Sequence, residues 1–232
     1  ASVNDEIERL RLAATSALLE RDDVIIVSTV SCIYGLGDPS TYMEMRLVLK
    51  LGETRNISLM ARQLVDMQYE RNDAVGERGN FRIHGDCIEI FPAYSKGGFR
   101  IQLEWDEIVR ITEFDPITRN DIAEYEYITI YPAKHFVVPQ DELKRAIEGI
   151  KTEMEARYEE LTNAGNLLEA QRIKSRTEYD IEMVEEIGYC SGIENYSRHI
   201  TGRKEGERPY VLLDYFPKDF LLFVDESHVT LS

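Results

Sequence analysis

The spacing of hydrophobic positions near the N-terminus predicts a helix followed by a buried strand. Apolar residues recur at steps of three and four from Ile7 through Leu10 and Ala14 to Leu18, which is the spacing of one helix face, and Asn4 is placed to cap that helix. The next run, "VIIVSTV" (24–30), is continuously apolar and β-branched, as in a parallel strand covered on both faces. A helix followed by such a strand indicates an α/β layer.

A glycine-rich loop, "SCIYGLGDPS", comes directly after this run. Loops at the carboxyl ends of strands carry the ligand sites of many α/β proteins. Ser40 can cap a helix that starts near Tyr42.

Alternating apolar positions predict an antiparallel sheet from Met67 to roughly Pro132, after a short helix around Ser58–Val65. Gly85 and Asp86 are expected to form a bulge or a turn, and the "SKGG" and "TRND" segments are expected to be turns. We interpret this stretch as a separate α+β unit. The alternating positions are Phe81, Ile83, Ile88, Ile90, Phe99, Ile101, Leu103, Trp105, Ile108, Ile111 and Phe114, and "YEYITIYPA" adds a further strand.

The next stretch is predicted to be a helical hairpin. Pro139 suits a first helical turn, and "NAG" (163–165) interrupts the helical spacing before a second helix from Asn166 to about Ile187, which Gly188 ends. Core packing is the simplest interpretation of the apolar stripe on the first helix, which consists of Leu143, Ile147, Ile150, Met154, Tyr158 and Leu161.

The last apolar run, "FLLFV" (220–224), predicts a second buried strand that ends in Asp225 and Glu226. Sequence typical of an α/β layer therefore stands at both ends and encloses the β-rich unit and the hairpin. The expected fold class is α/β with an inserted α+β unit and a helical hairpin.

Composition narrows the possible function classes. A net charge of −16 argues against a general nucleic-acid binder, which needs a basic surface. No apolar run approaches the length of a membrane span, and the charged N-terminus lacks the apolar stretch of a signal peptide. Cys32, Cys87 and Cys190 are far apart and include no CxxC pair, so a zinc site or a disulfide framework is not expected and a reducing cytosol fits.

A strand that ends in Asp-Glu is what a nucleotide hydrolase needs, because one carboxylate can hold Mg²⁺ and the other can polarise the attacking water. An exposed loop start would explain the same two residues, and a lone His228 is more often structural. The GxxxxGK[ST] sequence that cradles phosphates does not occur in the chain, so either "DESH" is not a nucleotide site or the chain is part of a longer protein.

Several strings resemble one family. "VIIVSTVSCIYGLGDP", "GNFRIHGDCIEIFPA", "GYCSGIENYSRHITGR" and "FLLFVDESHVTL" together are similar to the UvrB family of the bacterial excinuclease ABC system, in the same order and with similar spacing. The family consists of helicase-like (RecA-like) ATPases of bacterial nucleotide excision repair, which UvrA loads onto damaged DNA and which recruit UvrC. The resemblance implies a phosphate loop and a DNA-inserting β-hairpin upstream of Ala1, and a second motor domain beyond Ser232.

The resemblance also implies a domain division. Residues 1–43 and 209–232 are similar to parts of the first motor domain, and residues 44–137, called here the insert, to the domain that binds UvrA. Residues 138–208 are similar to a helical, DNA-facing subdomain.

By the same resemblance, Asp225 would coordinate Mg²⁺ in the intact protein, Glu226 would activate water, and His228 would couple nucleotide state to DNA contacts. ATP and Mg²⁺ are therefore expected cofactors of the intact protein. The chain alone is expected to bind neither and to be inactive as an ATPase.

The expected UvrA contacts are Arg71, Arg82 and Arg100, which match contact positions of the family. Strand alternation puts Arg82 and Arg100 on the face opposite their apolar neighbours, so both are expected to point to solvent. His84 and Gln102 stand where the family often has arginine and glutamate, which puts those two contacts in doubt. Without the resemblance, solvated edge charges would be the simpler interpretation.

Candidate DNA contacts are Tyr34, Arg198, His199 and Arg203, because basic residues with interleaved aromatics suit a nucleic-acid strand. The alternative is that Tyr34 packs under its loop and that Arg198 pairs with a carboxylate such as Glu194.

Two functional classes follow: a piece of an ATPase motor and a protein-docking module. The runner-up identity is the similar UvrA-binding module of transcription-repair coupling factors, which "ENYSRH" followed by the DESH run disfavours.

Overall fold

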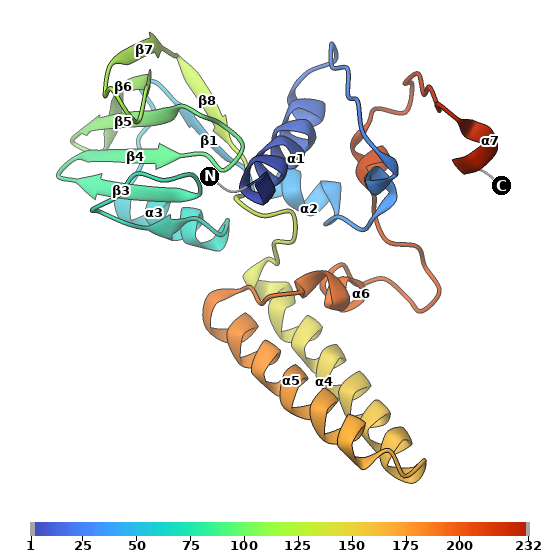
Figure 1. Ribbon diagram of the computed structural model, residues 1–232. Helices are drawn as coiled ribbons and strands as arrows, with labels where there is room; N and C mark the ends of the chain where they lie inside the picture. Colours follow the sequence, from blue (N-terminus) through green and yellow to red (C-terminus); the bar gives the residue numbers. More distant parts are fainter. Residues whose placement is uncertain (1–2, 231–232) are drawn as a thin grey trace.

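The computed structural model describes residues 3–230, which form three parts that meet near the middle of the molecule (Figure 1). A β-sheet unit lies to one side, a helical hairpin extends away from the centre, and a hub of short helices and extended segments joins them. Each part has a hydrophobic core of its own. Within residues 3–230, no helix is both long and apolar enough to cross a membrane.

The hub brings together segments from both ends of the chain. It contains the helices α1 (Val3–Glu20) and α2 (Pro39–Glu44) and the short turns η1 (Val30–Ile33) and η3 (Leu212–Tyr215). Leu36 and Tyr210 form an isolated antiparallel bridge, and the Tyr215 hydroxyl donates to the Gly37 carbonyl at 3.1 Å. The hub is therefore built by residues that are far apart in sequence.

Tyr42 lies at the centre of the hub core. Its side chain is fully buried, its hydroxyl donates to the Pro132 carbonyl at 3.2 Å, and its ring stacks on Tyr131. The Tyr42 ring also stacks on His135, whose Nε2 is 3.2 Å from the Thr15 hydroxyl oxygen. Burial and the nearby charge of Arg11 lower the pKa of His135 to about 3, so this histidine is neutral in the fold.

Both buried strands predicted for the hub are wrong. Residues 24–30 and 220–224 are apolar but form no strand, and their side chains include some of the most exposed hydrophobic groups, such as Val27 at 96% and Phe223 at 84%. A strand in a sheet needs a neighbour that takes its backbone hydrogen bonds. No other segment among residues 3–230 pairs with either run.

The expected caps of the hub helices also differ. Asp38 rather than Ser40 caps α2: its carboxylate accepts from the Ser40 N–H at 2.9 Å, and Pro39 takes the first helical position. Asn4 lies inside α1. The buried face of α1 carries Leu12, Thr15, Ser16 and Leu18, whereas Ile7 and Leu10 are half exposed.

The sheet unit contains six hydrogen-bonded strands in sequence order. All neighbours are antiparallel except the first pair, which is parallel. The predicted turns lie between strands at 85–86, 95–97 and 118–120, while Gly98 and Asp121 already belong to the strands that follow. The strands are β2 (Glu70–Arg71), β3 (Asn80–His84), β4 (Cys87–Phe91), β5 (Gly98–Glu104), β6 (Glu107–Phe114) and β7 (Asp121–Glu124).

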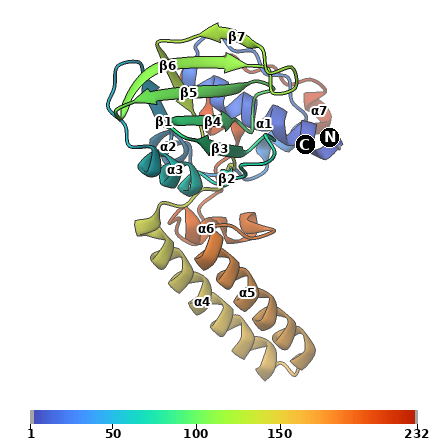
Figure 2. The ribbon, with the colours of Figure 1, turned by 90° about the vertical axis from the view of Figure 1, so that its left-hand side faces the viewer.

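One face of this sheet packs on α3 (Ile57–Asp66), as Figure 2 shows. The predicted alternation holds for Phe81, Ile88, Ile90, Ile101, Ile108 and Ile111, which are buried. Trp105 breaks it, because it lies in the turn between β5 and β6 with a positive φ of 51° and is 99% exposed.

A separate two-stranded ladder connects the sheet unit to the hub. The strand predicted in "YEYITIYPA" is β8 (Tyr127–Ile130), and it pairs antiparallel with β1 (Leu47–Lys50) instead of joining the larger sheet. The chain therefore enters the insert through β1 and returns to the hub through β8, and these two strands lie next to each other.

The helical hairpin is confirmed. It consists of α4 (Gln140–Asn163) and α5 (Leu167–Ile187), with Gly165 at a positive φ in the connection and Gly188 as the left-handed C-cap. Leu143, Ile147, Ile150 and Met154 are buried as expected. The short elements η2 (Ile193–Tyr196) and α6 (Ser197–Ile200) return along α4, and α7 (Ser227–Thr230) is the last described helix.

We predict that Gly37→Ala destabilises the hub by about 1–3 kcal/mol or more, because overpacked sites must move their surroundings. A Cβ on Gly37 would overlap the backbone carbonyl oxygen of His135. Gly35→Ala is the matched control in the same loop, since its Cβ would lie 3.4 Å from the Pro209 Cβ, an ordinary contact. Thermal unfolding of the two variants measures the difference, and equal melting temperatures would contradict the packing described.

Candidate functional site

The six-stranded sheet carries a charged row on the face opposite its core. The row runs across neighbouring strands because Arg82 pairs with Glu89, Glu89 with Arg100, and Arg100 with Thr112 in the strand registers. Since side chains alternate along each strand, these residues share one face while Phe81, Ile88 and Ile101 share the other. We call this surface, with Arg82, Glu89, Arg100 and Arg119, the arginine face.

Glu89 is the central residue of the arginine face. It is 4% exposed, and three guanidinium groups donate to its carboxylate: Arg82 Nε to Oε2 at 2.6 Å, Arg100 Nε to Oε1 at 2.9 Å, and an Arg119 terminal nitrogen to Oε1 at 2.6 Å. Charged hydrogen bonds of this kind are stronger than neutral ones.

The three pairings decide the charge state of Glu89. Burial alone would raise the pKa of its carboxyl, but the hydrogen bonds from Arg119, Arg100 and Arg82 outweigh burial, and the pKa lies below its ordinary value. Glu89 is thus an anion at neutral pH.

The expected solvent orientation of Arg82 and Arg100 needs correction. Both lie on the predicted face, but their side chains are only 15% and 19% exposed. A buried carboxylate between them attracts both guanidiniums and draws them down onto the sheet, so neither is a freely solvated edge charge.

The same three guanidiniums also lie over aromatic rings of the sheet. Arg82 lies 5.5 Å from the centroid of the Phe91 ring, and Arg100 and Arg119 each lie 4.6 Å from the centroid of the Phe114 ring. The two rings meet edge to face. Stacking on a ring face adds a cation–π attraction and restricts rotation of each guanidinium.

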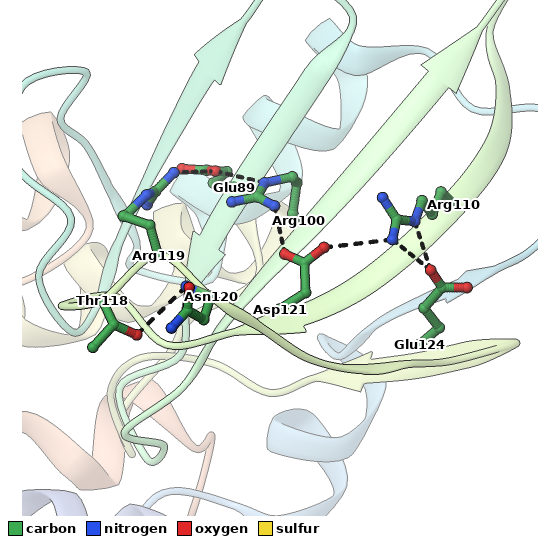
Figure 3. A network of polar contacts seen from close by, with 8 residues as sticks. All are labelled: Glu89, Arg100, Arg110, Thr118, Arg119, Asn120, Asp121 and Glu124. Atoms are coloured by element: carbon green, nitrogen blue, oxygen red, sulfur yellow. Dashed lines mark hydrogen bonds and ion pairs between the residues drawn. The ribbon is translucent and has the colours of Figure 1, made fainter.

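Figure 3 shows the charges continuing along the sheet as an alternating series. Arg100 also donates to Asp121 at 2.9 Å, Asp121 accepts from Arg110 at 3.4 Å, and Arg110 donates to Glu124 at 2.8 Å through Nε. Asp121 and Glu124 are more exposed than Glu89, so this end of the series is solvated.

The remaining predicted partner contact, Arg71, lies apart from this network. Its side chain is 52% exposed and pairs with Asp73 at 2.9 Å on the β2 edge of the sheet. His84 and Gln102 belong to the next row of the same face, where Cys87 pairs with both in the strand registers. The structure therefore brings Arg82 and Arg100 together and leaves Arg71 separate.

The predicted DNA contacts lie in two places. Tyr34 is 66% exposed at the end of η1, so it does not pack under its loop. Arg198 pairs with Glu153 of α4 at 2.6 Å, not with Glu194, and His199 contacts the same carboxylate. Arg203 donates to the hydroxyls of Thr201 and Ser197. These basic residues are thus anchored to the hairpin and the turn that follows α6.

The predicted catalytic residues lie at the end of the exposed run 220–224. Asp225, Glu226 and His228 are all exposed, Glu226 has a positive φ of 48°, and His228 Nε2 lies 3.4 Å from a Glu226 carboxylate oxygen. Residues 3–230 hold no cluster of three or more His, Cys, Asp or Glu side chains suited to a metal ion.

Glu89, Arg110 and Arg119 were missed by the sequence analysis. One signal was present: a carboxylate stands between two core isoleucines in "CIEIF", on a strand expected between two others that carry arginines at alternating positions. The involvement of Arg119, which comes from a turn, had no comparable signal.

Two family models match the chain. The UvrB interaction domain matches residues 47–136, which include the whole arginine face, and the UvrB third helical domain matches residues 141–202.

Several curated proteins are similar over the whole length of the chain. UvrABC system protein B of Treponema denticola is 59% identical over 99% of the chain, and that of Gemmatimonas aurantiaca is 56% identical over 100% of it. The protein of the same name from Treponema pallidum (strain Nichols) is 54% identical. The chain spans about a third of the length of these relatives, between 33% and 35%.

We predict that Glu89 makes stability depend on pH in the acid range. Because its folded pKa is lowered, its contribution is fully present above the ordinary pKa of a glutamate and is lost as pH falls through the lowered value. Glu89→Gln should cost about 1.5–3 kcal/mol at neutral pH, the usual value of hydrogen bonds to a charged group, and much less once Glu89 is protonated. Urea unfolding at several pH values measures this.

Glu104→Gln is the matched control, since it removes the same charge from an exposed position on the strand of Arg100. A constant difference between parent and Glu89→Gln at all pH values would contradict the prediction.

Proposed function

The chain belongs to the UvrB family, and on that premise we propose that it serves bacterial nucleotide excision repair as the part of a UvrB protein that docks UvrA. The observation that carries the proposal is the arginine face, which lies within the residues matched by the interaction-domain model. Arginine is, with tryptophan and tyrosine, one of the side chains enriched among the residues that carry most of the binding energy of protein interfaces. The transcription-repair coupling factor is not favoured, because relatives that match the whole chain are UvrABC system protein B.

In this proposal Arg82 and Arg100 are the central contacts and Arg71 lies at the rim. The first two are held by Glu89 and by aromatic rings, so little side-chain entropy remains to be lost when a partner binds. Arg71 is half exposed beside Asp73, and exposed pairs of this kind contribute little.

The ATPase and DNA roles of the intact protein also belong to the proposal. Residues 1–43 and 209–232 would form part of a RecA-like motor domain, in which Asp225, Glu226 and His228 serve ATP hydrolysis in the cytoplasm. The contacts between these two segments in the hub support that division. Tyr34, Arg198, His199 and Arg203 would contact damaged DNA, and UvrC would act after verification.

We predict that Arg82→Ala and Arg100→Ala each weaken UvrA binding by about 2–5 kcal/mol, as expected when one partner of a desolvated charge pair is truncated. Arg71→Ala should cost under about 1 kcal/mol. Arg62→Ala is the control, because Arg62 is exposed on α3, across the sheet. Calorimetry against purified UvrA gives the affinities, and circular dichroism confirms folding. If folded Arg82 and Arg100 variants bind like the parent, the interface lies elsewhere.

For the motor role, we predict that Glu226→Gln in a full-length UvrB stops ATP turnover while leaving nucleotide binding largely unchanged. A group that acts mainly in the transition state lowers the rate more than it lowers ground-state affinity. Steady-state phosphate release and a fluorescent-nucleotide titration separate the two effects. Lost binding with normal residual turnover would show that the role is misassigned.

A further inference from the structure

The three arginines on Glu89 retain unused donors. Among residues 3–230, Arg82 donates only through Nε, Arg119 through one terminal nitrogen, and Arg100 through Nε and one terminal nitrogen. Arg119 is itself exposed, and no remaining nitrogen of Arg82 or Arg100 is among the buried polar atoms that lack a partner, so these donors reach solvent. The terminal fork of Arg82 is free as a pair, the arrangement that accepts a carboxylate in bidentate geometry.

This donor excess is larger than Glu89 requires. A buried carboxylate needs compensation for its desolvation, but here three cations share one anion. Along the whole series, Arg82, Arg100, Arg110 and Arg119 stand against Glu89, Asp121 and Glu124. The arginine face thus carries a local positive surplus on a chain whose net charge is −16.

The backbone at Arg119 has a strained conformation that directs its side chain toward Glu89. Arg119 has a φ of 65°, a left-handed conformation that costs a residue with a Cβ about 1–2 kcal/mol. The turn is fixed by Asp115, whose carboxylate accepts from the N–H groups of Ile117 and Thr118. The Arg119 guanidinium consequently lies over the Phe114 ring. It also reaches Glu89, as Figure 3 shows.

We propose that Glu89 is a positioning residue that holds Arg82, Arg100 and Arg119 as a receptor for carboxylate side chains of the partner protein, and that Arg119 is a direct contact. This deepens the proposed docking function and rests on it. Protein carboxylates fit better than a nucleic-acid backbone, because Asp121 and Glu124 border the receptor and would repel a continuous row of phosphates.

A positioning role and long-range electrostatics predict opposite changes in UvrA affinity for Glu89→Gln. Glu89→Gln removes a negative charge from a surface that binds an acidic partner, so long-range attraction alone would strengthen binding. A positioning role predicts the reverse, because the released arginines must be ordered again when the partner binds. Each such side chain costs roughly 2- to 13-fold in affinity, so we expect UvrA affinity to fall at least about tenfold.

The binding experiment compares the parent chain with Glu89→Gln, Arg119→Ala and Glu104→Gln by calorimetry against UvrA, with circular dichroism and thermal unfolding of each. Glu104→Gln should bind like the parent or slightly more tightly. Arg119→Ala keeps Glu89 paired with two arginines and should fold normally, yet lose affinity about tenfold, the scale of one charged contact. If both Glu89→Gln and Arg119→Ala are folded and bind UvrA at parental strength, the proposal is overturned.

A second measurement needs no UvrA. In the free, ¹⁵N-labelled chain, the Nε–H signals of Arg82 and Arg100 should be protected from solvent exchange and should lose that protection in Glu89→Gln but not in Glu104→Gln. Titration with glutarate, a plain dicarboxylate, should shift the Arg82 and Arg119 signals in the parent. Unchanged protection in Glu89→Gln, or no shift with glutarate, would overturn the positioning role.

The two measurements separate this inference from the docking function. If the parent does not bind UvrA but the NMR results are as expected, the partner is wrong and the receptor stands. If the parent binds a duplex oligonucleotide and Glu89→Gln abolishes that binding, the receptor serves phosphates and the assignment to protein carboxylates is overturned.

Discussion

A carboxylate can be buried in a sheet only if its charge and its lone pairs are satisfied, and Glu89 meets that condition through three arginines. Much of the insert's outer face follows from this. The guanidiniums come to rest on the Phe91 and Phe114 rings, and the 115–121 turn folds back so that Arg119 can reach the carboxylate. A surface that would otherwise carry loose, solvated arginines becomes one with fixed donor positions.

The attachment of the insert to the hub also fixes the position of the arginine face. β1 and β8 pair side by side, so the insert is attached to the hub by two adjacent strands and not by free linkers. On the hub side, the Tyr42 ring stacks on Tyr131 and on His135, and its hydroxyl donates a hydrogen bond to the Pro132 carbonyl, just after β8. The arginine face therefore belongs to a unit with its own core and a short, packed attachment, which suits a docking element that must present its contacts in a constant orientation.

The face on which Arg82 and Arg100 lie could be predicted from the sequence, but the ion-pair network around Glu89 could not. Alternation along β3 and β5 placed Arg82 and Arg100 opposite Phe81 and Ile101, since side-chain direction in a strand has a period of two residues. It could not give their exposure, because exposure depends on what the neighbouring strand carries at the same register. Glu89 lies between both arginines in the registers of β4, and the register is a property of the assembled sheet. Arg119 comes from a turn, where no periodic rule applies.

Residue spacing and turn residues were sufficient to predict those elements whose hydrogen bonds come from the same segment or from the next one along the chain. The helical hairpin, its break at 163–165 and its end at Gly188 follow from spacing and from glycine's access to positive φ, and the meander from β3 to β6 follows from alternation and turn residues. In the hub, tertiary structure decided which apolar runs form strands. Runs 24–30 and 220–224 have strand-like composition but no partner strand within residues 3–230, and most of their side chains lie exposed. A strand, unlike a helix, takes its hydrogen bonds from another segment of chain.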